Sequence, residues 1–161
     1  MLNFFKKTPK ESKITAPLQG TIVNIEDVDD PVFSQKMVGD GVAINPENNE
    51  VVSPTDGQVI QVFDTKHAVG IMAKNGAEIL IHIGLETVKL KGKGFKTLVK
   101  PGDKVKAGQV LITFDYKYLA ENAKSLVTPV VITNTEEMEL IEKIACENVK
   151  PQDTIMKLTK K

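Results

Sequence analysis

The two histidines of this chain, His67 and His82, are the residues best suited to chemistry, because the sequence between them predicts a hairpin. Asn75-Gly76 separates two runs rich in β-branched residues. This dipeptide is the strongest short-range signal for a type I′ turn, which has positive φ at both central residues. Paired residue numbers then sum to 151, so His82 faces Val69 and shares a face with His67. Their Cβ atoms should lie at most about 7–8 Å apart, whereas a one-residue slip would separate them.

Two convergent imidazoles in an apolar surface are costly to bury, which points to a functional reason for the pair. His82 interrupts the apolar run Ile79–Ile83, and Gly84 leaves a gap beside it. Charging one ring lowers the pKa of the other, so a neutral nucleophilic nitrogen stays available near pH 7. The first interpretation is phosphoryl transfer through phosphohistidine, with one imidazole as nucleophile and the other donating to the phosphoryl oxygens.

Two other kinds of site stay open at this point. A zinc ion could use both histidines, with oxygen ligands from Asp40, Asp64 or Glu86, although no ligand-spacing motif is present and two nitrogens are too few. A swinging-arm carrier domain would place Lys74 at a hairpin tip, but it gives the histidines no role and ranks last.

The composition is typical of a single globular domain. Because it includes no arginine, any phosphate contact must come from other groups. The 161 residues are 41% apolar and 26% charged, and the 21 basic residues, all lysine, balance 21 acidic ones. This balance argues against a nucleic-acid partner. Cys146 is the only cysteine, which fits a reducing compartment, and no apolar run is long enough for a membrane span or signal peptide. We therefore expect a cytoplasmic protein.

The first 13 residues differ in composition from the rest. Leu2, Phe4 and Phe5 precede a segment with four lysines and one glutamate. We expect residues 1–13 to be a flexible tail that weakly contacts an anionic membrane surface, and residues 14–161 to be one domain.

From Ile14 onward the pattern is β, with proline and glycine between short runs rich in β-branched residues. The expected strands lie near 21–25, 42–44, 58–63, 110–114, 127–133 and 154–158. Helical signals are limited to a turn capped by Asp30-Pro31 and two turns from Tyr116 to Ala123. A small-Pro-x-x-Gly motif occurs at Ala16–Gly20 and again at Ser53–Gly57. The fold class predicted is all-β: a compact barrel-sandwich of short, mostly antiparallel strands with one or two single-turn helices.

Three segments resemble a known family, the glucose-type enzyme IIA component of the bacterial phosphoenolpyruvate-dependent sugar phosphotransferase system. They are Val38–Ile44, Thr65–Ala68 and, above all, Glu78–Val88 with Leu90–Phe95. The resemblance extends from about Ile14 to Lys161. The family usually has aspartate where this chain has Glu86, so the carboxylate here reaches one methylene further.

The resemblance implies a role for each candidate residue. His82 would be phosphorylated on Nε2, His67 would stabilise the phosphoryl group, and Thr65 would orient His67. Asp40 and Glu86 would meet an arginine of the incoming protein, around a shallow apolar depression. From the residues we expect its rim to consist of Val42, Ile44, Phe63, Val69 and Leu80.

The implied function is that of a phosphocarrier. The chain would accept a phosphoryl group from the histidine phosphocarrier protein and pass it to a cysteine on the B domain of a glucose-type sugar permease. No cofactor would be required, although zinc at His67 and His82 stays open. The alternative is a mainly regulatory binding protein whose phosphorylation state controls transporters or kinases.

Overall fold

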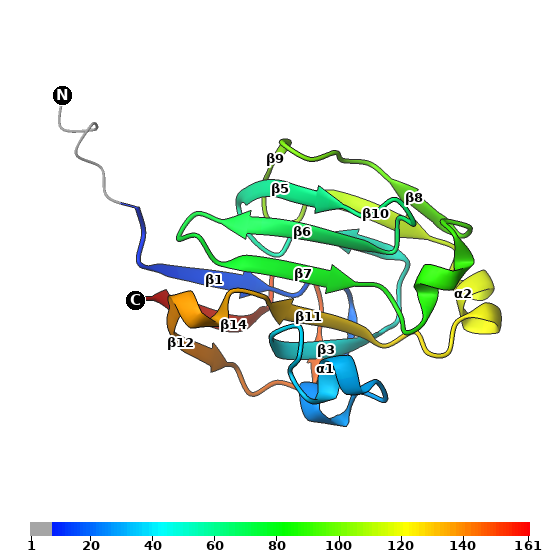
Figure 1. Ribbon diagram of the computed structural model, residues 1–161, viewed down its shortest axis with the longest axis horizontal. Coiled ribbons are helices and arrows are strands. Elements are labelled where there is room, and N and C mark those ends of the chain that lie inside the picture. Colours follow the sequence, from blue (N-terminus) through cyan, green and yellow to red (C-terminus); the bar gives the residue numbers. More distant parts are fainter. Residues whose placement is uncertain (1–7) are drawn as a thin grey trace.

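The computed structural model describes residues 8–161 and is built almost entirely from antiparallel strands (Figure 1). The strands are β1 (Glu11–Thr15), β2 (Gly20–Asn24), β3 (Asp40–Pro46), β4 (Glu50–Val52), β5 (Gly57–Val62), β6 (Ala68–Ala73), β7 (Glu78–His82), β8 (Phe95–Thr97), β9 (Lys104–Val105), β10 (Val110–Phe114), β11 (Thr128–Ile132), β12 (Met138–Lys143), β13 (Asn148–Val149) and β14 (Thr154–Lys160). The helices are α1 (Pro31–Ser34) and α2 (Tyr116–Asn122), with 3-10 turns at Ile25–Asp27, Thr87–Leu90 and Thr135–Glu137. The all-β prediction is confirmed.

The strands form one large sheet and two small ones. The large sheet has the order β13-β2-β3-β11-β7-β6-β5-β9, and the small sheets have the orders β4-β10-β8 and β1-β14-β12. A shared apolar core, with Ile14, Ile44, Ile71, Ile81 and Leu111 completely buried, connects the sheets. Because β6, β7 and β11 lie inside the large sheet, the ends of these central strands provide a rigid support for side chains.

Both helical segments form where the sequence predicts them, because each has an aspartate N-cap. The Asp30 carboxylate accepts from the Val32 amide at 3.0 Å, and Pro31 occupies the first helical position of α1. The Asp115 carboxylate accepts from the Tyr118 amide at 3.0 Å at the start of α2. The α1 turn ends at Ser34, three residues before the expected Met37, because Lys36 adopts a left-handed conformation with φ +57°.

The β6–β7 hairpin forms, but its turn and register differ from the sequence prediction. Only Gly76 has positive φ, and the loop contains three residues, Lys74 to Gly76, closed by a bond from the Ala73 amide to the Ala77 carbonyl at 2.8 Å. Paired residue numbers therefore sum to 150, and His82 faces Ala68 instead of Val69. The type I′ turn and the register of 151 are wrong.

Asn75 explains why the turn closes differently. Its side chain is completely buried, and its amide nitrogen donates to the carbonyls of Lys10 and Leu158, while its oxygen accepts from the Ala77 amide. These bonds attach the hairpin tip to the β1 and β14 segments. A buried amide with every bond satisfied decides the turn type, because leaving it unpaired would cost more than a change of turn.

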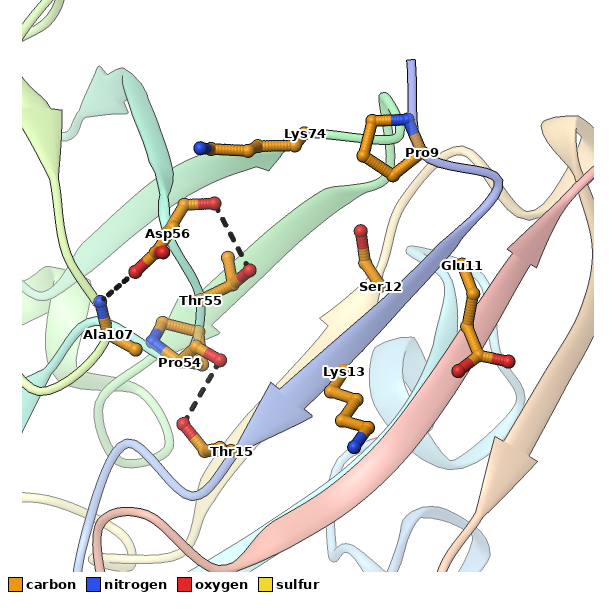
Figure 2. Close-up of a pocket in the computed structure, with 10 residues that line it drawn as sticks. All are labelled: Pro9, Glu11, Ser12, Lys13, Thr15, Pro54, Thr55, Asp56, Lys74 and Ala107. Carbon is orange, nitrogen blue, oxygen red and sulfur yellow. Dashed lines mark hydrogen bonds between the residues drawn. The ribbon is translucent and has the colours of Figure 1, made fainter. Parts of the chain in front are cut away.

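The repeated Pro-x-x-Gly motif has an equivalent structural role in its two copies. Gly20 opens β2 and Gly57 opens β5. The Thr15 amide donates to the Pro54 carbonyl at 2.8 Å, and the Val52 amide donates to the Pro17 carbonyl at 2.9 Å. Figure 2 shows the first of these two contacts, where the Thr15 hydroxyl also donates to the Pro54 carbonyl. The two copies thus join strands distant in sequence.

Part of the segment predicted to be a tail, residues 11–13, belongs to a strand. Glu11, Ser12 and Lys13 belong to β1, which pairs with β14, and Ser12 is buried. The lysine-rich composition of this segment did not indicate a strand, although Ser12 and Ile14, at alternate positions of β1, are buried. The predicted membrane contact of Leu2, Phe4 and Phe5 lies outside the described residues. No helix within residues 8–161 has both the length and the apolar character needed to cross a membrane.

Candidate active site

His82 is the last residue of β7, and its ring is fixed by the backbone that follows. Its Nδ1 lies 2.8 Å from the Gly84 carbonyl oxygen, which can only accept a hydrogen bond. Nδ1 therefore carries the proton, and Nε2 keeps its lone pair. Gly84 has φ +73°, and a Cβ there would lie 2.8 Å from Thr87 Cγ2 and 2.9 Å from the Ser125 carbonyl. Only glycine allows the chain to turn this carbonyl toward the ring.

His67 precedes β6 and sits in a turn rather than in the pleated strand. The Phe63 amide donates to the Ala68 carbonyl and the Lys66 amide donates to the Phe63 carbonyl, with Lys66 at φ +61°. The Thr65 hydroxyl lies 2.7 Å from Nδ1 of His67, as expected for a residue that orients the ring. A hydroxyl can donate to Nδ1 or accept from it, and the imidazole proton lies on Nε2 in the tautomer in which the hydroxyl donates.

The two histidine rings are in contact. Their centroids lie 4.8 Å apart, with the ring planes at 82°. Phe33 packs against His82 at 5.0 Å between centroids, and Phe63 packs edge-on against His67 at 5.5 Å. The prediction that the histidines are neighbours is confirmed, although the register behind it is wrong. The turn with Lys66 moves His67 out of the strand alternation that would otherwise separate the rings.

Both imidazoles are held in the neutral form near pH 7. Burial, followed by repulsion from the protonated form of His82, lowers the pKa of His67 to about 4, while a hydrogen bond to the Thr65 backbone opposes this shift; the residue is only 3% exposed. Burial also lowers the pKa of His82, while the hydrogen bond to the Gly84 carbonyl and the charge of Asp30 oppose this shift. A neutral imidazole with a free Nε2 is the nucleophilic form.

The lowered pKa of His67 predicts a pH-dependent stability. In the unfolded chain the imidazole titrates near 6.5, so between pH 6.5 and 4 the unfolded state binds more protons than the folded state. The free energy of unfolding should therefore fall as the pH decreases through this window, by up to roughly 3 kcal/mol from His67. Urea unfolding of wild type and His67→Gln between pH 7.5 and 4 measures the effect. The variant should lose less stability; parallel curves would contradict the neutral, buried His67.

An apolar depression of about 420 Å³ contains both histidines. Its other lining residues are Asp30, Val32, Phe33, Val38, Phe63, Leu80, Glu86 and Val88. Phe63 and Leu80 thus lie where the sequence predicts. Val42, Ile44 and Val69 do not line the depression, because they belong to interior strands of the large sheet and are at most 5% exposed. In strands that are covered on both faces, side chains do not alternate between buried and exposed, so these three residues stay in the interior.

The two candidate carboxylates lie in different environments. Asp40 is not among the lining residues: its Oδ1 accepts from Lys143 Nζ at 2.8 Å and lies 3.6 Å from Lys36 Nζ. Burial would raise the pKa of Asp40, but the hydrogen bond and charges of these lysines hold it below its ordinary value. Glu86 lines the depression, is about half exposed and lies 3.9 Å from Lys124 Nζ.

The comparisons with known proteins agree with this geometry. The family model described as "phosphoenolpyruvate-dependent sugar phosphotransferase system, EIIA 1" matches residues 12–138. The glucose-specific EIIA component of Bacillus cereus is 54% identical over 152 residues, covering 94% of this chain and 92% of that protein. The corresponding component of Halalkalibacterium halodurans is 54% identical over 147 residues, covering 91% and 85%. The solved structure of glucose permease IIA from Mycoplasma capricolum matches with a TM-score of 0.86 and 41% identity over 96% of this chain and 97% of that one.

This chain belongs to the EIIA 1 family of the phosphoenolpyruvate-dependent sugar phosphotransferase system. It is a phosphotransferase component of sugar transport, and the family resemblance seen in the sequence is confirmed. The structural match also confirms the fold predicted for it.

Several lining residues of this EIIA component were not identified from the sequence. They are Asp30, Val32, Phe33, Val38 and Val88. A signal was present for the first three, since Asp30-Pro31 predicts a capped turn, but nothing in the sequence places that turn over β7. The contact of Phe33 with His82 arises only from tertiary packing.

The histidine pair does not amount to a complete metal centre. Among residues 8–161 no group of three or more histidine, cysteine, aspartate or glutamate side chains is arranged to hold a metal ion. Two imidazole nitrogens are fewer than the three or four protein ligands that zinc uses. Zinc at His67 and His82 therefore stays a prediction from the sequence.

Proposed function

We propose that His82 accepts a phosphoryl group on Nε2 from the histidine phosphocarrier protein and passes it to a cysteine on the B domain of a glucose-type permease. The observation that carries this proposal is the Nδ1–Gly84 hydrogen bond, which leaves Nε2 as the free nucleophilic nitrogen beside a second imidazole. The glucose class is supported by the printed names of the similar proteins.

Acceptance is an exchange of one P–N bond for another. The lone pair of His82 Nε2 attacks phosphorus, the bond to the donor's histidine breaks, and its electron pair returns to the donor nitrogen. The proton on Nδ1 of His82 stays shared with the Gly84 carbonyl, because a deprotonated Nδ1 would face an oxygen lone pair. The phosphorylated ring therefore carries positive charge next to the new bond, and this keeps the phosphoryl group easy to transfer.

Onward transfer reverses the same steps. The thiolate of the B domain attacks phosphorus, and the N–P electron pair returns to Nε2. His67 assists by donating its Nε2 proton to a phosphoryl oxygen, in the tautomer in which the Thr65 hydroxyl donates to Nδ1. Such a positioned donor stabilises charge that develops in the transition state.

The apolar lining keeps water from competing with the thiolate. Phe33, Phe63 and Leu80 surround the histidines, and exposed Val32 and Val88 extend the apolar surface outward. A docked partner would cover this surface and exclude water from the reacting groups. Glu86 at the rim and Asp40 beside Lys143 are proposed to meet the partner's cations; for Asp40 this requires displacement of the lysine.

Phosphoryl flow through purified components tests the proposal. Labelled phosphoenolpyruvate, the general phosphotransfer proteins and this chain should give a phosphopeptide containing His82. The labelled chain should then transfer to membranes that contain a glucose-type permease with its B domain, and less to membranes with a permease of another sugar class. Omission of the histidine phosphocarrier protein is the control. Label retained on the chain in the presence of every B domain would instead favour a purely regulatory protein.

A further inference from the structure

The depression around the histidines has the wrong charge for a site that receives a phosphoryl group. Asp30 and Glu86 are among its lining residues, whereas no described lining residue is a lysine. The chain also contains no arginine. The negative charge of an incoming phosphoryl group is therefore opposed, not balanced, by the ionised groups that line the depression.

Asp30 is held at the rim by the structure. Its carboxylate caps α1 through the Val32 amide at 3.0 Å, and the same helical turn places Phe33 against the His82 ring. The carboxylate cannot move away without loss of the cap. Its charge acts on the reacting ring, because it raises the pKa of His82 against the effect of burial.

Glu86 contributes less to this field. Its side chain is 53% exposed, and Lys124 Nζ lies 3.9 Å away, so solvent and a cation both reduce its effect. Lys124 also lies 3.8 Å from Asp29, whose side chain is 91% exposed and is absent from the lining. Asp29 and Asp30 thus carry the same charge one residue apart, but only Asp30 faces the histidines.

We propose that Asp30, assisted by Glu86, is a specificity determinant that prevents small anionic phosphoryl donors from phosphorylating His82. The proposal rests on His82 as the phosphoacceptor. A carboxylate at the rim repels a free phosphate ester or phosphoramidate, whereas it attracts a protein whose cation accompanies the phosphoryl group. Spontaneous labelling by small metabolites, which would bypass the transport pathway, is thereby suppressed.

Phosphoramidate, H₃N⁺–PO₃²⁻, is a suitable probe because it carries the phosphoryl group without a protein. The lone pair of neutral His82 Nε2 forms the N–P bond, the P–N bond of the reagent breaks, and its electron pair leaves on the amine as ammonia. Net charge is conserved, because the phosphorylated ring keeps its Nδ1 proton. The reaction uses the same nucleophile as the protein donor but lacks a partner surface.

The experiment compares labelling of His82 by phosphoramidate and by the phosphorylated histidine phosphocarrier protein. Asp30→Asn keeps a side chain able to cap α1, so the fold is preserved. We expect this variant to react about tenfold faster with phosphoramidate and several-fold more slowly with the protein donor. Glu86→Gln should shift both rates in the same directions but less. Asp29→Asn is the matched control and should leave both rates unchanged.

Ionic strength provides a second measurement. The wild-type rate with phosphoramidate should rise with salt as the repulsion is screened, and the Asp30→Asn rate should depend on salt less steeply. If Asp30→Asn changes the labelling rates with both donors in the same direction, Asp30 tunes the basicity of His82 and does not select between donors, and the inference is wrong. If the phosphoramidate rate is unchanged, the inference is also wrong, while His82 labelling by the protein donor keeps the proposed function intact. Label on a residue other than His82 would overturn both.

Discussion

Replacement of His82 with alanine should abolish labelling of the chain by the histidine phosphocarrier protein. The side chain supplies the nucleophilic Nε2, and its lone pair is left free by the bond from Nδ1 to the Gly84 carbonyl. His67 should not act as a substitute, because it is only 3% exposed and its Nδ1 is engaged by Thr65. Loss of a nucleophile removes the covalent step itself, so the expected residual labelling is below detection.

The label is measured as acid-labile, base-stable phosphate on the isolated chain. His82→Asn serves as the matched variant, because an asparagine amide can still donate toward the Gly84 carbonyl and preserve the local backbone. Both variants should unfold cooperatively and remain unlabelled. Labelling of His67 in either variant would show that the nucleophile has been assigned to the wrong ring.

Replacement of His67 with glutamine should separate the two transfer steps. Glutamine keeps a donor of similar reach, so acceptance at His82 should remain within a few-fold of wild type. Onward transfer should fall about 10²–10³-fold, equivalent to roughly 2.7–4 kcal/mol, because the donor in the transition state is no longer preorganised. The flexible amide lacks the fixed orientation that contact with the His82 and Phe63 rings gives to the imidazole.

Single-turnover transfer from the labelled chain to a purified B domain measures this effect directly. Thr65→Val is the matched variant: it keeps the shape of the side chain but removes the hydroxyl 2.7 Å from Nδ1 of His67. It should slow the same step by a smaller factor, because the ring remains but loses the hydroxyl contact that orients it. Wild-type transfer by His67→Gln would remove His67 from the mechanism.

Much of the strand pattern was readable from the sequence, because it depends on local chemistry. The predicted strand at 110–114 coincides with β10, the predicted Asp30-Pro31 cap starts α1, and the predicted helical stretch from Tyr116 forms α2. The motif around His82 indicated the family. Residues 11–13 were misassigned to the tail, because their pairing partner, β14, lies at the other end of the chain.

The sequence by itself determined the nature of the chemistry: two histidines, no arginine and an apolar strand that ends at His82. It could not determine how the rings meet. A buried Asn75 bonded to β1 and β14 segments changed the turn and shifted the register, and the turn with Lys66 then restored the contact between His67 and His82. The sequence also could not determine which residues line the depression. The α1 turn contributes Asp30 and Phe33 to the lining. Val42, Ile44 and Val69 are buried in the core instead. Local propensities are properties of a few adjacent residues, whereas burial and hydrogen-bond satisfaction depend on segments that only tertiary packing brings together.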